Sequence, residues 1–442
     1  IELGEKNMKI HCLIVLFLAG MGLAGWITAQ EPPSPPKTLV VKAAHLGDVR
    51  AGRTLGPHAI LIRGERIEKV GPANEIAAPA GATVIDLGDA TLLPGLIDCH
   101  VHLTSDPEYA GLKGLSISVP RETLTGAKNA RLTLLAGFTT VRNVGASAYS
   151  DVALRDAVDA GELPGPRIVP AGIALGSTGG HCDETFLAPE FAYRDEGVAD
   201  GVPAVLAKTR EVIKYGADVI KFCASGGVFS QGDLPSTEQY STEEMSALVA
   251  EAHRQGRKVA AHAHGGQALI DAARAGADSI EHGSLIDEEG IRVMKEHGTY
   301  LVADIYNDDF ILSQGKARGF TDEMLEKERS IGQKQREGFR RAAQAGVKIA
   351  YGTDAGVYPH GWNAKQFAYM EKYGLTPAQA LQSATLNAAE LLGWSDKVGS
   401  IEAGKFADLV AFAGDPLTDV STLEHVKFVM KGGQVFVNAI PR

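Results

Sequence analysis

Two pairs of histidines have a spacing that suits a metal site. His100 and His102 lie two residues apart, and so do His262 and His264. Side chains two residues apart point to the same face of an extended strand, so each pair presents two imidazoles on one side. Imidazole binds ions such as Zn, Mn, Fe or Co, whereas Ca and Mg prefer oxygen ligands. The pairs therefore predict a site for zinc or a transition metal.

Three more ionisable residues lie within or at the end of apolar runs. His282 and Asp354 end two such runs, and Lys221 lies inside a third, at 219–222. Ionisable side chains seldom occupy a buried strand without a partner, because removing them from water is unfavourable. We therefore expect these three residues to share one site with the histidine pairs.

Lys221 needs a chemical change before it can join a metal site. An ammonium group is repelled by a divalent cation, and the ordinary lysine pKa is about 10.4. Reaction of the neutral amine with CO2 gives a carbamate, an anion able to bridge two metal ions. The alternative is a buried salt bridge, for example with Asp354.

The candidate residues fall in runs that alternate with helical patterns. The helical segment 241–256 begins with Ser241 and Glu244, the residues of a capping box. Eight strands alternating with helices predict the α/β class, as a TIM (β/α)8 barrel, whose catalytic groups lie at the C-terminal strand ends. The eight strand candidates are 95–103, 138–145, 166–172, 218–227, 258–265, 278–284, 299–305 and 347–356.

The two ends of the chain alternate apolar and polar residues and predict a small β-sandwich. Short strand-like segments fill 38–90, and similar ones follow at 405–416 and 426–438. We expect these segments to meet in one sandwich domain. The predicted domains are residues 31–92 plus 396–442 for the sandwich and 93–395 for the barrel.

Residues 1–30 predict upstream sequence followed by a signal peptide. Residues 1–7 are polar, Met8 reads as the start, Lys9 supplies a positive charge, and 13–25 is an apolar run. A transmembrane anchor is the alternative, but the run is shorter than the ~20 residues of a membrane span. We therefore expect a secreted or periplasmic protein with no membrane attachment after the signal is removed.

Charge and cysteine content exclude some classes of protein. Among 442 residues the formal net charge is -11, which argues against a nucleic-acid partner because such partners require a basic surface. Cys12 lies in the predicted signal, and Cys99, Cys182 and Cys223 are too few for a disulfide framework. A Cys182–Cys223 bridge is compatible with an oxidising compartment, but the sequence alone does not establish it.

Five motifs together resemble the amidohydrolase superfamily. They are GLIDCHVHL at 95–103, AHAHG at 261–265, IEHGS at 280–284, YGTDAG at 351–356, and DVIKFCASGG at 218–227. From Thr38 onward the chain is similar to the branch of imidazolonepropionase-related Xaa-Pro dipeptidases and ochratoxin-hydrolysing amidases. The resemblance implies two divalent metal ions, zinc by default, and an N6-carboxylysine at Lys221.

The resemblance also implies six metal ligands in two sets. The histidines of the first strand and the aspartate of the eighth hold one ion. The histidines of the fifth and sixth strands hold the other, and the carboxylated lysine is shared. His264 is expected to orient the ligands rather than to bind. The six ligands are His100, His102, Lys221, His262, His282 and Asp354.

Four residues are expected to act on the substrate. Asp354 is the expected proton shuttle from the attacking water to the leaving amine. His181, in a Gly-Gly-His context, would hydrogen-bond the tetrahedral oxyanion. Tyr240 resembles a tyrosine that contacts the substrate α-carboxylate in related dipeptidases. Arg142 is another candidate partner for that carboxylate, or a member of a structural ion pair.

The predicted function is hydrolysis of an amide or peptide bond in a small molecule by a hydroxide between the two metals. The enzyme would be a dipeptidase or N-acyl amino acid amidase that releases a C-terminal amino acid. A lactonase or phosphotriesterase on the same site is the first alternative. Imidazolonepropionase activity is typical of a one-metal site and a cytoplasmic pathway, so this function is disfavoured. A non-catalytic barrel would be expected to lack one or more metal ligands, so it is disfavoured as well. The resemblance also implies a homo-oligomer, such as an octamer.

Overall fold

The computed structural model describes residues 37–440, and the predicted signal segment at 1–30 lies outside the described residues. From Lys37 onward the chain forms one compact unit. Within this part of the chain, none of the helices combines the length and the apolar character needed to cross a bilayer.

Seven of the expected barrel strands form two parallel sheets, in the orders β10-β9-β8 and β11-β12-β13-β14. Nearly every residue in them is buried, as expected for strands that are covered on both faces. The strands are β8 (Leu96–Val101), β9 (Phe138–Asn143), β10 (Arg167–Pro170), β11 (Val219–Cys223), β12 (Lys258–Gly265), β13 (Ser279–Leu285) and β14 (Tyr300–Val302).

The eighth strand candidate, 347–356, lies between β14 and β8. On one side, the backbone N–H of Leu301 donates to the carbonyl of Lys348 across 2.8 Å. On the other side, the N–H of Cys99 donates to the carbonyl of Tyr351, also across 2.8 Å. This segment therefore joins the last strand of one sheet to the first strand of the other.

The segment after β10 closes the remaining gap, between β10 and β11. The N–H of Leu175 donates to Lys221 O at 2.9 Å, and the N–H of Cys223 donates to Leu175 O at 2.8 Å. The predicted TIM (β/α)8 barrel is thus confirmed. Because all its strands are parallel, their C-terminal ends meet at one rim.

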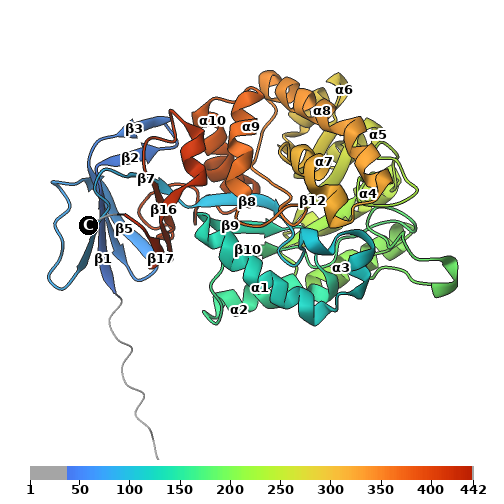
Figure 1. The fold of residues 1–442 in the computed structure, drawn as a ribbon, viewed down its shortest axis with the longest axis horizontal. Helices are drawn as coiled ribbons and strands as arrows, with labels where there is room; N and C mark the ends of the chain where they lie inside the picture. Colours follow the sequence, from blue (N-terminus) through green and yellow to red (C-terminus); the bar gives the residue numbers. More distant parts are fainter. Residues whose placement is uncertain (1–36, 441–442) are drawn as a thin grey trace, which may run out of the picture. The chain divides into compact units, whose positions relative to one another are not determined.

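Helices follow the strands and cover the outer face of the barrel (Figure 1). The predicted capping box is present at the start of α4, where Ser241 Oγ accepts from Glu244 N and the Glu244 carboxylate accepts from Ser241 N. The helices are α1 (Val119–Leu135), α2 (Ser150–Asp159), α3 (Val202–Lys214), α4 (Thr242–Arg254), α5 (Gly266–Arg274), α6 (Glu288–His297), α7 (Asn307–Arg318), α8 (Asp322–Ala345), α9 (Gln366–Lys372), α10 (Pro377–Gln382) and α11 (Ala388–Leu391).

The β-sandwich takes strands from both ends of the chain, as predicted. One sheet has the order β5-β4-β1-β6 and the other β17-β16-β15-β7-β2-β3. In the second sheet β15 pairs antiparallel with β7, so that Val410 lies opposite Leu93. The strands are β1 (Thr38–Ala43), β2 (His45–Asp48), β3 (Arg53–Leu55), β4 (His58–Arg63), β5 (Arg66–Pro72), β6 (Thr83–Asp86), β7 (Thr91–Pro94), β15 (Leu409–Phe412), β16 (Val426–Lys431) and β17 (Gln434–Asn438).

An apolar core lies between these sheets. Leu39 and Ile60 from the N-terminal part pack with Leu409 and Phe428 from the C-terminal part, and all four are buried. The domain boundaries expected at 92/93 and 395/396 stay predictions, because sandwich and barrel belong to one compact unit.

Candidate metal centre and active site

All six predicted metal ligands line one cavity of about 830 Å3. They reach it from the C-terminal part of β8, β11, β12, β13 and the eighth strand. The side chain of His102 is 28% exposed and that of Asp354 12%, and the other four residues are more than nine-tenths buried. The six are His100, His102, Lys221, His262, His282 and Asp354.

The first metal set forms a compact group. Nε2 of His100 lies 3.3 Å, and Nε2 of His102 3.4 Å, from Asp354 Oδ1. The ligand atoms of these three residues lie within 4.8 Å of one another. Asp354 N donates to His100 O across 2.8 Å, which ties the eighth strand to β8 at this point. Asp354 also has a φ of 55°, a strained left-handed conformation of the kind found at functional sites.

The His100 ring is arranged to bind a cation. Its Nδ1–H donates to Glu281 Oε2 across 2.7 Å, and Nε2 then faces Asp354. Nε2 is buried and has no hydrogen-bond partner among the described residues. A lone pair facing a carboxylate oxygen is repelled unless a proton or a metal ion lies between them. Burial and Lys221 lower the pKa of His100, but Asp354 and Glu281 outweigh them and raise it above its ordinary value.

The second set is centred on His262 and His282, whose ring centroids lie 4.6 Å apart. Nε2 of His262 lies 3.1 Å from Gly226 O, so Nδ1 is its free nitrogen. Nδ1 of His282 lies 3.0 Å from Asp304 Oδ1, so Nε2 is its free nitrogen. Burial lowers the pKa of His262 well below its ordinary value and keeps the ring neutral, as a metal ligand must be.

Lys221 is buried in β11 and lines the same cavity. Burial lowers its pKa to about 8, although Glu281 and Asp354 oppose the shift. The neutral amine, which is the form that reacts with CO2, is therefore more abundant than in an exposed lysine. Within residues 37–440, no carboxylate lies within 4.0 Å of Lys221, so the alternative salt bridge with Asp354 is not formed.

Asp304 is a site residue that the sequence analysis missed. It follows β14, lines the cavity, and lies with His282 in a second group of metal-capable side chains. Its carboxylate accepts hydrogen bonds from Asn307 Nδ2 at 2.6 Å and Gln335 Nε2 at 2.8 Å. Because its carboxylate also accepts a hydrogen bond from His282 Nδ1, it orients that ring toward the cavity. Its position directly after a barrel strand could have indicated a site residue. However, 304–309 contains three aspartates, and the sequence does not distinguish among them.

Arg142 is not placed to bind a substrate. It is 1% exposed and lies in the barrel interior, outside the cavity lining. Nη2 donates to Glu281 Oε1 at 2.7 Å, Nη1 to Ser279 Oγ at 2.9 Å, and Nε to Cys99 O at 2.5 Å. Glu281 in turn holds His100. Of the two roles left open by the sequence, this placement fits the structural ion pair, because the guanidinium donates only to groups inside the protein.

Tyr240 also lies away from the cavity. It is 1% exposed and packs near Phe222, with ring centroids 6.2 Å apart. Its hydroxyl has no hydrogen-bond partner in the described part of the chain. The expected contact with a substrate carboxylate does not fit this placement, because core residues enclose the phenol. The tyrosines that line the cavity are Tyr109, at the end of a short 3-10 helix (Pro107–Tyr109), and Tyr193, in an irregular segment, and neither lies in a recognisable motif.

His181 and His264 lie beside the metal ligands and line the cavity. The His181 ring stacks on His262, with centroids 4.2 Å apart. His264 stacks on His282, with centroids 5.0 Å apart. The structure therefore brings His181 and His264 against His262 and His282, two of the predicted metal ligands.

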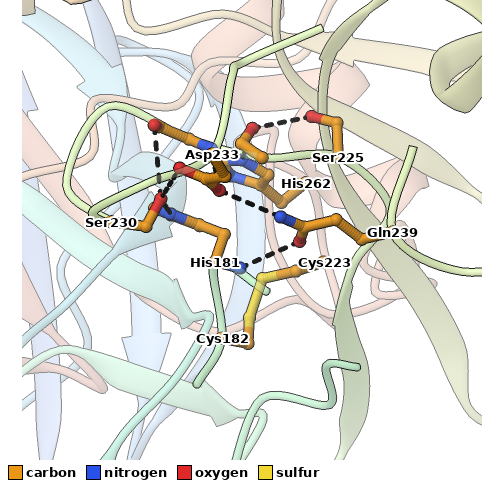
Figure 2. Close-up of a disulfide and its surroundings, with 10 residues drawn as sticks. His181, Cys182, Cys223, Ser225, Ser230, Asp233, Gln239 and His262 are labelled. Carbon is orange, nitrogen blue, oxygen red and sulfur yellow. Dashed lines mark hydrogen bonds between the residues drawn. A yellow bond between two sulfur atoms is a disulfide. The ribbon is translucent and has the colours of Figure 1, made fainter. Parts of the chain in front are cut away.

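Cys182 and Cys223 form a disulfide next to this site (Figure 2). Their Cα atoms lie 6.0 Å apart, and 41 residues separate them in the sequence. Cys99 is a free, buried cysteine. The pairing that the sequence left open is thus present.

The comparison with known families agrees with this geometry. Residues 91–436 match the model of the amidohydrolase family. The chain belongs to the amidohydrolase family. The match spans the barrel and the sandwich strands β7, β15 and β16 with most of β17, and it confirms the resemblance carried by the motifs.

Named amidohydrolase relatives cover most of the chain. Ochratoxinase of Aspergillus niger is 34% identical over 368 residues, which are 78% of this chain and 75% of that protein. A crystal structure of a Xaa-Pro dipeptidase with bound methionine is 38% identical, has a TM-score of 0.83, and covers 91% of this chain and 100% of its own. A prolidase in complex with N-methylphosphonate-L-proline is 34% identical, with a TM-score of 0.83 and coverage of 91% and 100%. These relatives identify the chain as a hydrolytic enzyme.

The ion pair beneath His100 leads to a stability prediction. We expect Arg142→Met to lower the free energy of unfolding by about 3–5 kcal/mol, because it leaves Glu281 buried without its cation. Urea denaturation measures the change. Arg292→Ala is the control and should change stability little, because its ion pair with Glu289 is exposed. If Arg142→Met instead raised KM and left stability unchanged, Arg142 would be a substrate-binding residue.

Proposed function

We propose that this amidohydrolase cleaves the amide bond of a dipeptide or an N-acyl amino acid and releases the C-terminal amino acid. The observation that carries the proposal is the convergence of four imidazoles, Lys221 and Asp354 on one cavity at the strand ends. The relatives support the substrate class, since they include a Xaa-Pro dipeptidase, a prolidase and an ochratoxinase.

The proposed cofactors are two divalent metal ions, with zinc as the default. Support comes from the free nitrogens that face the cavity, namely Nε2 of His100, Nδ1 of His262 and Nε2 of His282. Such ions, when bound, make a water molecule acidic and polarise a carbonyl group. One ion would be held by the set of His100, His102 and Asp354, and the other by His262 and His282, with Lys221 shared as N6-carboxylysine.

Asp354 is the proposed proton shuttle. Burial alone would raise its pKa, but the neighbouring rings of His100 and His102 outweigh burial and keep the pKa below its ordinary value. Asp354 is therefore a carboxylate before the reaction and accepts the proton of the attacking water. It then gives this proton to the leaving amine, which becomes the new amino terminus of the released amino acid.

His181 is proposed to stabilise the oxyanion that forms on the attacked carbonyl. Ser230 Oγ donates to Asp233 Oδ1 at 2.7 Å, so it accepts the Nδ1–H of His181 at 2.9 Å. Nε2 is left for the substrate and donates only when the ring is protonated. Burial lowers the pKa of His181 to about 4 in the free protein, although Asp233 opposes the shift. The negative oxyanion raises that pKa again during the attack.

The charge of the cavity favours a dipeptide with a free amino terminus over an N-acyl amino acid. Among the described residues that line it, Lys221 is the only lysine or arginine. Burial raises the pKa of Glu328 to about 8, so the negative charge of the wall comes from the other carboxylates. A protonated α-amine is attracted to such a wall, whereas an acyl group is not. The acidic lining residues outside the metal set are Asp106, Glu122, Glu184, Asp195, Glu196, Asp304 and Glu328.

The proposed location is outside the cytoplasm, in the periplasm or the medium. The Cys182–Cys223 disulfide supports it, because such bonds persist in oxidising compartments. The homo-oligomer implied by the resemblance stays a prediction.

The substrate proposal is tested with a library of Xaa-Pro and other dipeptides, each paired with its N-acetyl form. We expect the zinc-loaded protein to cleave a subset of the dipeptides and to prefer the free amine, because the cavity is acidic. Removal of metal with a chelator should abolish turnover, and added zinc should restore it. A lactone and a phosphotriester serve as control substrates. Cleavage of these alone, or full activity of the metal-free protein, would contradict the proposal.

The proposed carbamate makes metal reconstitution depend on CO2. Metal-free protein in CO2-free buffer should regain little dipeptidase activity on addition of zinc, and added bicarbonate should restore it. Lys221→Met is the matched control and should stay inactive with bicarbonate, because it cannot form the bridging anion. Full recovery with zinc alone would mean that Lys221 acts without carboxylation.

A further inference from the structure

His181 acts from a segment with little regular structure. Between 177 and 196 the structure contains a single short 3-10 helix, η4 (Pro189–Phe191). The metal ligands, in contrast, belong to barrel strands or follow them directly. A catalytic group on such a segment needs other contacts to hold it within a few tenths of an ångström of its working position.

A covalent bond ties this segment to the barrel directly beside His181. Cys182 is the next residue along the chain, and its partner Cys223 lies in β11, two residues after Lys221. The N–H of Cys223 donates to Leu175 O at 2.8 Å, so the anchoring end of the disulfide is part of the barrel wall. Figure 2 shows the bridge beneath His181. The backbone that carries the imidazole is therefore fastened to the strand that carries Lys221.

Hydrogen bonds hold His181 from the opposite side, and they lead to one carboxylate. Nδ1 of the ring is bonded to Ser230 Oγ, which donates to Asp233 Oδ1 (Figure 2). The backbone N–H of His181 donates to Gln239 Oε1 at 2.9 Å, and Gln239 Nε2 donates to Asp233 Oδ2 at 2.9 Å. Asp233 thus fixes both the ring and the backbone of His181.

Lys327 of α8 anchors Asp233 in turn. Its Nζ donates to Asp233 Oδ1 at 2.7 Å and to Ser230 O at 2.8 Å. The side chains of Lys327 and Asp233 are 7% and 9% exposed, so this ion pair is shielded from solvent. The chain of contacts therefore runs from a barrel helix to the imidazole.

The space around the ring leaves little room for a second position. A Cβ atom on Gly227 would come within 2.2 Å of the His181 ring, so only glycine permits this close approach of the backbone. On its other face the ring stacks on His262. A shift of His181 thus has to open the contact with Ser230 or lift the ring away from the metal site.

We propose that the Cys182–Cys223 disulfide and Asp233, anchored by Lys327, together position His181 over the metal site for the reaction. The disulfide fixes the backbone of the segment, and Asp233 fixes the ring through Ser230 and Gln239. This inference rests on the proposed role of His181 in amide hydrolysis. Loss of either the disulfide or the Asp233 contacts leaves the metal ligands in place but frees the imidazole of His181. We therefore expect kcat to fall while KM changes little.

The test uses Cys182→Ser/Cys223→Ser rather than a reducing agent, because thiols bind metal ions and a free Cys223 would lie next to the site. We expect His181→Asn to lower kcat by about 100–1000-fold. The double serine variant should lower it by about 10–100-fold, at a temperature well below its melting point and with two metals retained. Combined with His181→Asn, it should have no further effect. An unchanged kcat, or effects that multiply in the combined variant, would overturn the proposal.

Asp233→Asn tests the hydrogen bonds that connect His181 to Asp233, and Asp322→Asn is its control. Asp322 lies at the exposed start of α8 and forms an ion pair with Lys316. It has no contact with the residues that hold His181. We expect Asp233→Asn to lower kcat and to weaken binding of a phosphonate dipeptide mimic, whose tetrahedral anion His181 would contact. Binding of the product amino acid should stay unchanged. Equal weakening of both ligands would contradict a role through His181.

A crystal structure of the zinc-loaded double serine variant separates this inference from the proposed function. We expect the His181 ring to lose its 2.9 Å contact with Ser230, while the six metal-site side chains keep their positions. That result would stand even if no dipeptide were cleaved. An unmoved His181 ring would overturn the positioning role, whatever the substrate is.

Discussion

The C-terminal rim of this barrel depends on one constraint, which is the burial of several imidazole rings close together. The ring of His282 lies 5.0 Å from that of His100 and 4.6 Å from that of His262. Burial lowers the pKa of His102 to about 3 and that of His262 well below its ordinary value, so these rings stay neutral. Nε2 of His100 and Nε2 of His102 both face Asp354 Oδ1, so a lone pair on either nitrogen is repelled by the carboxylate. A cation among them would relieve that repulsion, so the cluster suits metal ions.

Carboxylates behind the rings turn them toward the common space. Glu281 holds His100 by Nδ1, and Asp304 holds His282 by Nδ1, so in both residues Nε2 faces the cavity. Each carboxylate accepts hydrogen bonds in turn, Glu281 from Arg142 in the barrel interior and Asp304 from Gln335 of α8. The orientation of these rings is therefore set by the two carboxylates and by the residues that hold the carboxylates in place. Packing inside the barrel and chemistry at its rim are in this way parts of one network.

His181 is held in position differently from the residues of the proposed metal site. Strands hold the ligands, whereas a disulfide and the contacts that lead to Asp233 and Lys327 hold His181. Barrel enzymes keep a rigid wall and vary the segments that follow the strands, so substrate choice lies in those segments. The acidic lining of the cavity comes mostly from such segments, where it would meet the amine of the proposed dipeptide substrate.

Local patterns in the sequence predicted the barrel, the sandwich of both chain ends and the candidate site residues, and the resemblance to the amidohydrolase superfamily assigned six of these residues as metal ligands. Strand alternation is a short-range property, so two residues of separation suffice to place His100 and His102 on one face. Only the tertiary structure decided that Arg142 pairs with Glu281, 139 residues away, that Asp304 orients His282, and that the core encloses Tyr240. It also decided the pairing of Cys182 with Cys223. These outcomes depend on which loops and strands meet across the barrel, and no local pattern encodes contacts between such distant segments.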